Sequence, residues 1–218
     1  MTAPLHHMIG IMGGTFNPIH HGHLRMAQEL ADALHLDEVR FIPSANPPHK
    51  NTPQVSASQR AAMVQMAIAD NPTFKLDERE LKRDGPSYTF DTLQSLRAEL
   101  GNDVSICLLM GSDAFVKLNT WHRWDELLNL CHIVSVVRTI KTSQEALAPA
   151  LQALLHQHYT EHIDDLTHSA KGHITMQEVT QLDISATTIR QQLQAKQSVR
   201  YITPNSVIEY INTQHLYG

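Results

Sequence analysis

Residues 8–34 read MIGIMGGTFNPIHHGHLRMAQELADAL, and this stretch decides the fold. Its first five residues are an apolar run of the length expected for a buried strand. Two glycines follow the run. From Gly22 onward, apolar residues recur at intervals of three and four, which predicts a helix with one face toward the core: Leu24, Ala27, Ala31 and Leu34. We therefore expect a strand, a glycine turn and a helix in direct succession.

The alternation of strand and helix continues along the chain. Apolar and β-branched runs predict further strands at residues 39–42, 74–77, 104–110, 133–137 and 173–179. Helical patterns occur after Ser56, which opens a capping box with Gln59, around 93–100, and over 144–159 with a kink or restart at Pro149. Two further helices are predicted over 185–195, with Ser185 as N-cap, and from Thr203-Pro204 onward, with Thr203 as the cap and Pro204 in the first turn. This order predicts an α/β fold with a doubly wound, mostly parallel sheet and helices on both faces.

Composition places the chain among globular proteins. Of its 218 residues, 42% are hydrophobic and 18% charged, and the formal net charge is -5. A general nucleic-acid or anionic-membrane binder needs a basic face, so we expect neither partner. No signal peptide and no apolar run of about 20 residues is visible. Cys107 and Cys131 lack disulfide or metal spacing and are expected to be buried reduced thiols, which suits a cytoplasmic protein.

The glycine turn at residues 13–23 carries the chemistry. Gly13 and Gly14 let backbone approach a ligand closely. The next helix presents unpaired N–H groups and a positive dipole end to the same crevice, and His20 and His23 would add two donors. Convergent donors suit a polyphosphate. A rival interpretation is a metal site made by His20, His21 and His23, and a further one is a chance cluster in a chain with 15 histidines.

This turn resembles a known signature. Gly14-Thr15-Phe16-Asn17-Pro18 with His20-x-Gly22-His23 is similar to the nucleotidyltransferase superfamily, whose His-x-Gly-His motif holds ATP phosphates. Further segments, in the same order, resemble the bacterial nicotinate-nucleotide adenylyltransferases: residues 42–50, Pro86-Ser87-Tyr88-Thr89, Gly111-Ser112-Asp113 with Thr120-Trp121, and 184–190. The resemblance implies a Rossmann-like single domain over residues 1–218, with a catalytic core at about 8–190 and a helical C-terminal part at about 185–218.

The resemblance also implies an activity and its residues. It implies adenylyl transfer from ATP to nicotinate mononucleotide in NAD biosynthesis, with His20, His23 and Arg190 as catalytic residues and Mg²⁺ carried by ATP rather than by protein ligands. The residues expected to bind ATP are Gly13, Gly14, Thr15, Phe16, His20, His23, Arg138, Ser185, Thr187 and Arg190. Those expected to bind nicotinate mononucleotide are Ser44, His49, Lys50, Tyr88, Thr89, Asp113 and Trp121.

Each of these residues also has a plainer interpretation. His49-Lys50 is equally a solvated loop tip, and Trp121 or Trp124 an ordinary core residue. Thr89 and Asp113 suit helix caps, while Arg190 on a helix often faces solvent. Two positions depart from the family pattern, because many relatives carry Asp at Asn17 and Tyr at His122.

Other functions remain open from the sequence. The same chemistry on nicotinamide mononucleotide or phosphopantetheine is the nearest alternative. A non-catalytic nucleotide sensor on the same fold and a histidine-rich metal-binding protein belong to different classes. The oligomeric state is not readable from the residues, and a homo-oligomer is possible.

Overall fold

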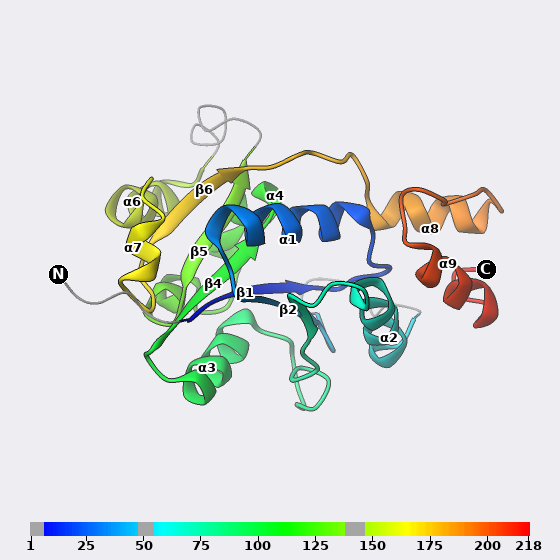
Figure 1. Ribbon diagram of the computed structural model, residues 1–218, viewed down its shortest axis with the longest axis horizontal. Helices are drawn as coiled ribbons and strands as arrows, with labels where there is room; N and C mark the ends of the chain where they lie inside the picture. Colours follow the sequence, from blue (N-terminus) through cyan, green and yellow to red (C-terminus); the bar gives the residue numbers. More distant parts are fainter. Residues whose placement is uncertain (1–6, 48–54, 138–146) are drawn as a thin grey trace.

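A computed structural model of the chain describes residues 7–47, 55–137 and 147–218 (Figure 1). Its strands form one parallel sheet in the order β3-β2-β1-β4-β5-β6. The strands are β1 (His7–Gly14), β2 (Glu38–Pro43), β3 (Phe74–Leu76), β4 (Val104–Met110), β5 (His132–Val137) and β6 (Ile174–Glu178). The predicted doubly wound parallel sheet is confirmed, and each strand lies within two residues of its predicted bounds at either end.

Helices connect and flank these strands. The α-helices are α1 (His21–Leu34), α2 (Ala57–Ile68), α3 (Thr89–Leu100), α4 (Ser112–Val116), α6 (Pro149–His158), α7 (Asp164–Thr167), α8 (Ala186–Gln194) and α9 (Asn205–Thr213). Two short 3₁₀ helices, η1 (Leu118–Thr120) and η2 (Trp124–Asn129), lie between β4 and β5. The sequence patterns did not predict α4, η1, η2 and α7, because elements this short carry little periodicity.

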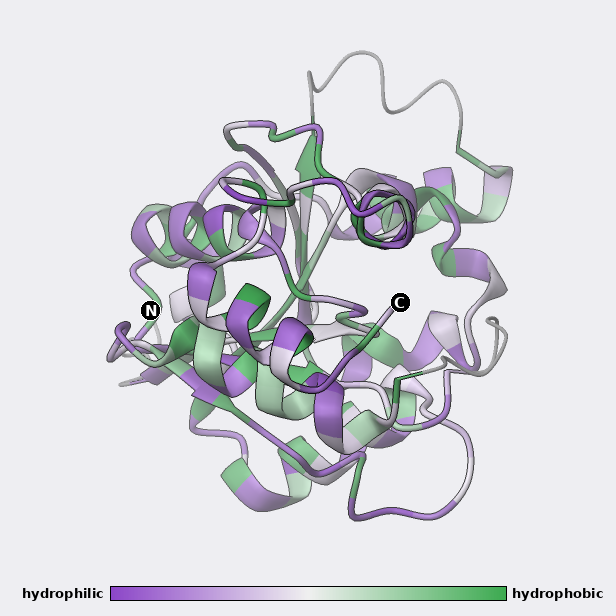
Figure 2. Ribbon diagram, turned by 90° about the vertical axis from the view of Figure 1, so that its right-hand side faces the viewer, coloured by the Kyte–Doolittle hydropathy of each residue, from purple (hydrophilic) through white to green (hydrophobic). Residues whose placement is uncertain are grey.

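The core consists of two apolar layers, one on each face of the sheet. Along β1, Met8 and Met12 belong to one layer, while Ile9 and Ile11 belong to the other, as alternating side chains of a strand require. Helices α1, α2 and α9 cover the first layer, and α3 and α6 cover the second. Figure 2 shows the helices around the sheet with both hydrophilic and hydrophobic residues. Helices on both faces are therefore confirmed.

Local signals mark the starts of some helices. Ser56 caps α2 by accepting a hydrogen bond from the backbone N–H of Gln59 at 3.2 Å, so the predicted capping box is confirmed. Helix α6 begins at Pro149, where a kink or restart was predicted. Residues 144–146 of that predicted helix lie outside the described ranges. The predicted cap at Thr203 is wrong by one position: Pro204 occupies the N-cap and α9 begins at Asn205.

The strand order places a crevice at the carboxyl end of β1. The chain runs from β1 outward to β2 and β3 on one side, then returns to β4 on the other side of β1. In open α/β sheets, ligands bind where the strand order reverses in this way, beyond the carboxyl ends of the strands. Here those ends are Gly13-Gly14 of β1 and Gly111, which follows β4. Within the described ranges, no helix has the length and hydropathy to cross a membrane.

Candidate functional site

Two histidines stand together at the start of α1. His20 is the N-cap residue, and His23 lies one turn into the helix. Their imidazole rings stack with centroids 3.7 Å apart and planes 28° apart. The ring of Phe16 meets the His23 ring edge-on at 5.2 Å, and this contact fixes the pair from the side of the glycine turn. The two rings that the sequence predicted as paired donors are therefore side by side.

Burial sets the protonation of His20. His20 is only 6% exposed, and loss of solvent, helped by the neighbouring His21, lowers its pKa from 6.5 to about 4. At neutral pH the ring is therefore uncharged and offers a single N–H. The backbone N–H of His20 donates to Nδ1 of His23 at 3.3 Å. Because Nδ1 of His23 accepts that bond, a neutral His23 carries its proton on Nε2.

The two glycines of the turn differ in the space beside them. A Cβ added to Gly13 would meet no described atom within 4 Å, and the same holds for Gly111 at the neighbouring strand end. A Cβ on Gly14 would instead lie 2.9 Å from the ring of Phe16. Phe16 itself has a positive φ of 46° and is buried beneath the turn. Open space thus lies beside Gly13 and Gly111, where a ligand would approach the backbone.

A buried arginine holds the turn in place. Arg60 of α2 is 1% exposed, and its guanidinium donates to the carbonyl oxygens of Thr15 at 2.6 Å and Ser44 at 2.7 Å. One side chain therefore ties the loop after β1 to the loop after β2. Burial lowers the pKa of Arg60, which nevertheless stays charged because a guanidinium deprotonates only far above neutral pH.

The predicted second phosphate grip reaches the same turn from α8. Ser185 caps the helix, since its hydroxyl accepts from the backbone N–H of Thr188 at 3.1 Å. Arg190 is half-buried and donates from Nη1 to the carbonyl oxygen of Asn17 at 2.8 Å and from Nη2 to the hydroxyl of Thr187 at 3.3 Å. The solvent-facing alternative for Arg190 is therefore wrong, because its side chain is anchored on the β1–α1 turn.

The segments predicted to choose the acceptor are also linked. Ser87 donates its backbone N–H to the carbonyl oxygen of Asn46 at 2.9 Å, and its hydroxyl accepts from the backbone N–H of Asn46 at 3.0 Å. The side-chain amide of Asn46 donates to the carbonyl oxygen of Gly85 at 3.1 Å. The loop that begins at Ser44 is thus fastened to the segment that leads into α3.

Aromatic contacts join the start of α3 to the chain after η1. Tyr88 occupies the N-cap of α3, so the interpretation of Thr89 as the cap is wrong by one residue. Its ring stacks on His122 with centroids 4.4 Å apart. The guanidinium of Arg123 lies 3.5 Å from the centre of the Phe90 ring. His122 and Arg123 are therefore held against the start of α3.

Trp121 and Asp113 occupy different environments. Trp121 is half-buried and packs against the second core layer, so it combines a structural contact with a partly exposed face. Asp113 is exposed in the first turn of α4, whose N-cap is Gly111 rather than Asp113. The capping alternative for Asp113 is wrong in position, although an acidic residue in a first turn is still favourable.

The comparisons agree on one assignment. A family model described as cytidylyltransferase-like matches residues 11–192. A protein of Pseudomonas fluorescens, described as a "probable nicotinate-nucleotide adenylyltransferase", is 49% identical over 210 residues, or 96% of both chains. One of Halorhodospira halophila with the same description is 46% identical over 218 residues, or 100% of this chain and 98% of the relative. The chain belongs to the nicotinate-nucleotide adenylyltransferase family.

A solved structure supports the fold of this family member. The nicotinic acid mononucleotide adenylyltransferase of Plasmodium falciparum, complexed with NaAD, has a TM-score of 0.72 to the chain. The alignment covers 97% of this chain and 98% of that one at 16% identity. At that identity the likeness extends to the fold alone, which is Rossmann-like as predicted.

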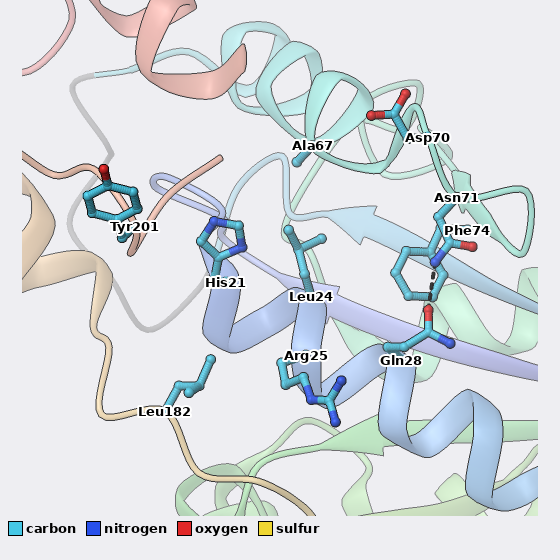
Figure 3. A pocket seen from close by; sticks show the side chains of 10 residues that line it. All are labelled: His21, Leu24, Arg25, Gln28, Ala67, Asp70, Asn71, Phe74, Leu182 and Tyr201. Carbon is cyan, nitrogen blue, oxygen red and sulfur yellow. Dashed lines mark hydrogen bonds between the residues drawn. The ribbon is translucent and has the colours of Figure 1, made fainter. Parts of the chain in front are cut away.

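Some residues expected in the family site do not lie in the cluster described above. His49, Lys50 and Arg138 fall outside the described residues. His21 lines a separate open pocket of about 630 Å³, formed by α1, the end of α2, Leu182 and Tyr201 (Figure 3). None of the described residues predicted to bind ATP or nicotinate mononucleotide lines that pocket. Because His21 faces it while His20 and His23 stack together, the three-histidine metal interpretation has no support from the geometry.

The sequence analysis missed two residues that shape this family site. Arg60 falls among the apolar positions Ala61, Met63 and Val64 of α2, and a lone arginine on a core-facing stripe is a signal that points to buried carbonyl partners. Tyr217 donates its hydroxyl to Oδ1 of Asn17 at 2.6 Å. Nothing near Tyr217 in the sequence indicates this contact, because the two residues are 200 positions apart.

Proposed function

We propose that this chain joins the AMP part of ATP to nicotinate mononucleotide, giving nicotinate adenine dinucleotide and pyrophosphate. One observation carries the proposal: the stacked His20–His23 pair at the N-terminus of α1, directly beyond the carboxyl end of β1. Relatives of near-equal length and almost half identical in sequence carry the name of this activity. The donors of the pair suit a polyphosphate.

The reaction needs positioned donors more than a base. A phosphate monoester has its second pKa near 6, so the acceptor's phosphate is already largely ionised at neutral pH. One of its oxygens attacks the α-phosphorus of ATP. The new P–O bond forms as the bond to the bridging oxygen of pyrophosphate breaks, and the electron pair leaves with pyrophosphate. Catalysis then consists of orientation and of stabilising charge on the phosphates.

The ATP side of the site supplies that stabilisation. His20 is a neutral ring, and a neutral His23 carries its proton on Nε2. The positive dipole end of α1 lies at the same turn, although the backbone N–H groups of His21 and His23 already donate to the carbonyl oxygens of Ile202 and His20. Arg190 is held beside them by the carbonyl oxygen of Asn17, and its guanidinium has donors beyond the one used there. In this proposal these groups bind the triphosphate and its leaving part.

Mg²⁺ is part of the proposal as a partner of ATP. Imidazole and guanidinium groups are poor ligands for this ion, whereas substrate phosphate oxygens suit it. When bound there, it would neutralise phosphate charge.

The acceptor side is proposed on the start of α3 and the segments fastened to it. An α-helix leaves its first N–H groups without intrahelical partners, so the N-terminus of α3 can receive the nicotinate carboxylate. Trp121 and the Tyr88–His122 stack provide flat surfaces for a pyridine ring. Stacking of a base on an aromatic ring contributes about 1–3 kcal/mol. Ser44, Thr89 and Asp113 remain proposed contacts of this substrate.

A pyrophosphate assay tests the function. The purified chain is mixed with ATP, Mg²⁺ and one acceptor at a time: nicotinate mononucleotide, nicotinamide mononucleotide or phosphopantetheine. We expect the highest kcat/KM with nicotinate mononucleotide, because unpaired N–H donors favour a carboxylate over an amide. A preference for either other acceptor would overturn the choice of substrate. Binding of ATP without pyrophosphate release from any acceptor would instead favour a nucleotide sensor.

Two wider expectations belong to the same proposal. The buried thiols Cys107 and Cys131 are free, and burial raises the pKa of Cys107 to about 12, which fits a reducing cytoplasmic setting. Cell fractionation checks that location. Self-association stays a prediction, and light scattering of the purified chain measures it.

A further inference from the structure

The β1–α1 turn is held by long polar side chains from three distant parts of the chain. Arg60 of α2 binds the carbonyl oxygen of Thr15, and Arg190 of α8 binds the carbonyl oxygen of Asn17. The third contact is the hydroxyl of Tyr217, which follows α9 and donates to Oδ1 of Asn17 at 2.6 Å. Asn17 therefore receives two hydrogen bonds, one on its backbone and one on its side chain.

Tyr217 is itself a fixed point. Its side chain is 6% exposed and packs in the first core layer with Val207 and Ile211 of α9. Burial raises the pKa of its phenol above the usual range, although Arg190 and Arg60 both act to lower it. At neutral pH the hydroxyl therefore keeps its proton and donates to Asn17.

Asn17 links Tyr217 to Arg190, because it is hydrogen-bonded to both. Nη1 of Arg190 depends on the carbonyl oxygen of Asn17 for its orientation, and Nη2 has only a longer bond of 3.3 Å to the hydroxyl of Thr187. If Asn17 moves, the better of these two anchors moves with it. Loss of the Tyr217 hydroxyl would leave Oδ1 of Asn17 without the donor that now fixes its side chain.

We propose that Tyr217 is a positioning residue for ATP: by fixing Asn17 it aims Arg190 at the phosphates. The inference rests on the proposed function in one respect, namely that Arg190 binds ATP phosphate. It adds a residue to which the sequence assigned no role in the site. Tyr217 touches no substrate in this scheme, so its effect should pass through Arg190 and should spare the acceptor.

The test removes only the hydroxyl, by Tyr217→Phe. The aromatic ring stays in the core, so the variant should fold. We expect the Kd and KM for ATP to rise about 3- to 10-fold, the range that loss of one hydrogen bond produces. The KM for nicotinate mononucleotide should change less than about twofold on the same scale. Tyr210→Phe is the matched control, because the Tyr210 hydroxyl on α9 has no hydrogen-bond partner among the residues described.

Testing Tyr217→Phe in an Arg190→Lys variant separates a positioning role of Tyr217 from a purely structural one. In Arg190→Lys the fork of donors is gone, so adding Tyr217→Phe should cause almost no further loss of ATP affinity. A full additional loss in that background would overturn the proposal. So would a variant that melts at a lower temperature but binds ATP as the wild type does, or one that weakens both substrates equally.

The readouts also keep the two proposals distinct. Binding of ATP by calorimetry requires no acceptor. If the wild type binds ATP and shows the coupling between Tyr217 and Arg190, yet releases no pyrophosphate with nicotinate mononucleotide, the positioning role stands and the proposed function fails. If the wild type binds no ATP at all, both fail.

Discussion

The imidazole rings of His20 and His23 stack 3.7 Å apart at the first turn of α1, and only one of them is deeply buried. His20 is the buried member of the pair. His23 packs against its ring and is oriented by the backbone N–H of His20. The pair therefore forms one unit, in which a buried neutral ring packs against a second ring that is oriented through its Nδ1.

The first prediction concerns His23. Its replacement by alanine should lower the rate of pyrophosphate release about 10²- to 10³-fold, because a preorganised donor to the phosphates is lost. Circular dichroism should show an unchanged fold. His21→Ala is the control, since His21 belongs to the same turn but lines the separate pocket, and it should keep nearly the full rate. A nearly normal rate for His23→Ala would remove His23 from the mechanism.

The second prediction uses the two adjacent glycines as a matched pair. A methyl group on Gly13 would enter the open space, so Gly13→Ala should melt like the wild type but bind ATP at least about tenfold more weakly. A methyl group on Gly14 would meet the buried Phe16 ring at 2.9 Å. Gly14→Ala should therefore lose about 1–3 kcal/mol of stability through overpacking.

Thermal melts and ATP titration of both glycine variants provide the check. If Gly13→Ala bound ATP normally, the triphosphate could not lie against that residue.

The third prediction concerns Arg60. Arg60→Met keeps the volume but leaves the carbonyl oxygens of Thr15 and Ser44 without their donor, so urea unfolding should show a loss of about 2–3 kcal/mol. The KM of both substrates should rise, because one loop belongs to each side of the site. Arg25→Met is the control: its exposed pair with Glu29 should contribute less than about 0.5 kcal/mol. Unchanged stability of Arg60→Met would contradict the role of Arg60 as a tie.

The fourth prediction is a dependence of stability on pH. Burial lowers the pKa of both His20 and His132 from 6.5 to about 4. His132 donates from Nε2 to the carbonyl oxygen of Ser169 and accepts on Nδ1 from the backbone N–H of His173. Protonation of Nδ1 would break the bond from His173. Between pH 6.5 and pH 4 the unfolded chain binds more protons than the folded one. The free energy of unfolding should therefore decrease as the pH is lowered through this window.

The size of the effect can be measured by urea unfolding at pH 8 and pH 5. Each histidine should contribute a loss of roughly 1–2 kcal/mol at pH 5 relative to pH 8. His132→Asn should have a shallower dependence on pH than the wild type, whereas His156→Asn, an exposed change on α6, should retain the full slope. An identical slope in wild type and His132→Asn would refute the assignment to His132.

Local patterns were sufficient for much of this molecule. The apolar run, the glycines and the spacing of three and four predicted β1, its turn and α1, and they placed His20 and His23 beside each other at a helix start. Capping residues predicted the start of α2 at Ser56 and of α8 at Ser185. These signals depend on contacts between residues a few positions apart, and such contacts are written directly in the order of residues.

The sequence by itself thus determined the alternation of strands and helices, the parallel sheet and the family signature. Only the tertiary structure decided which distant residues secure the site: Arg60 on Thr15, Arg190 on Asn17 and Tyr217 on the same Asn17, at separations of 45, 173 and 200 positions. No local pattern encodes these bonds, because they exist only where tertiary packing brings α2, α8 and the segment after α9 to the end of β1.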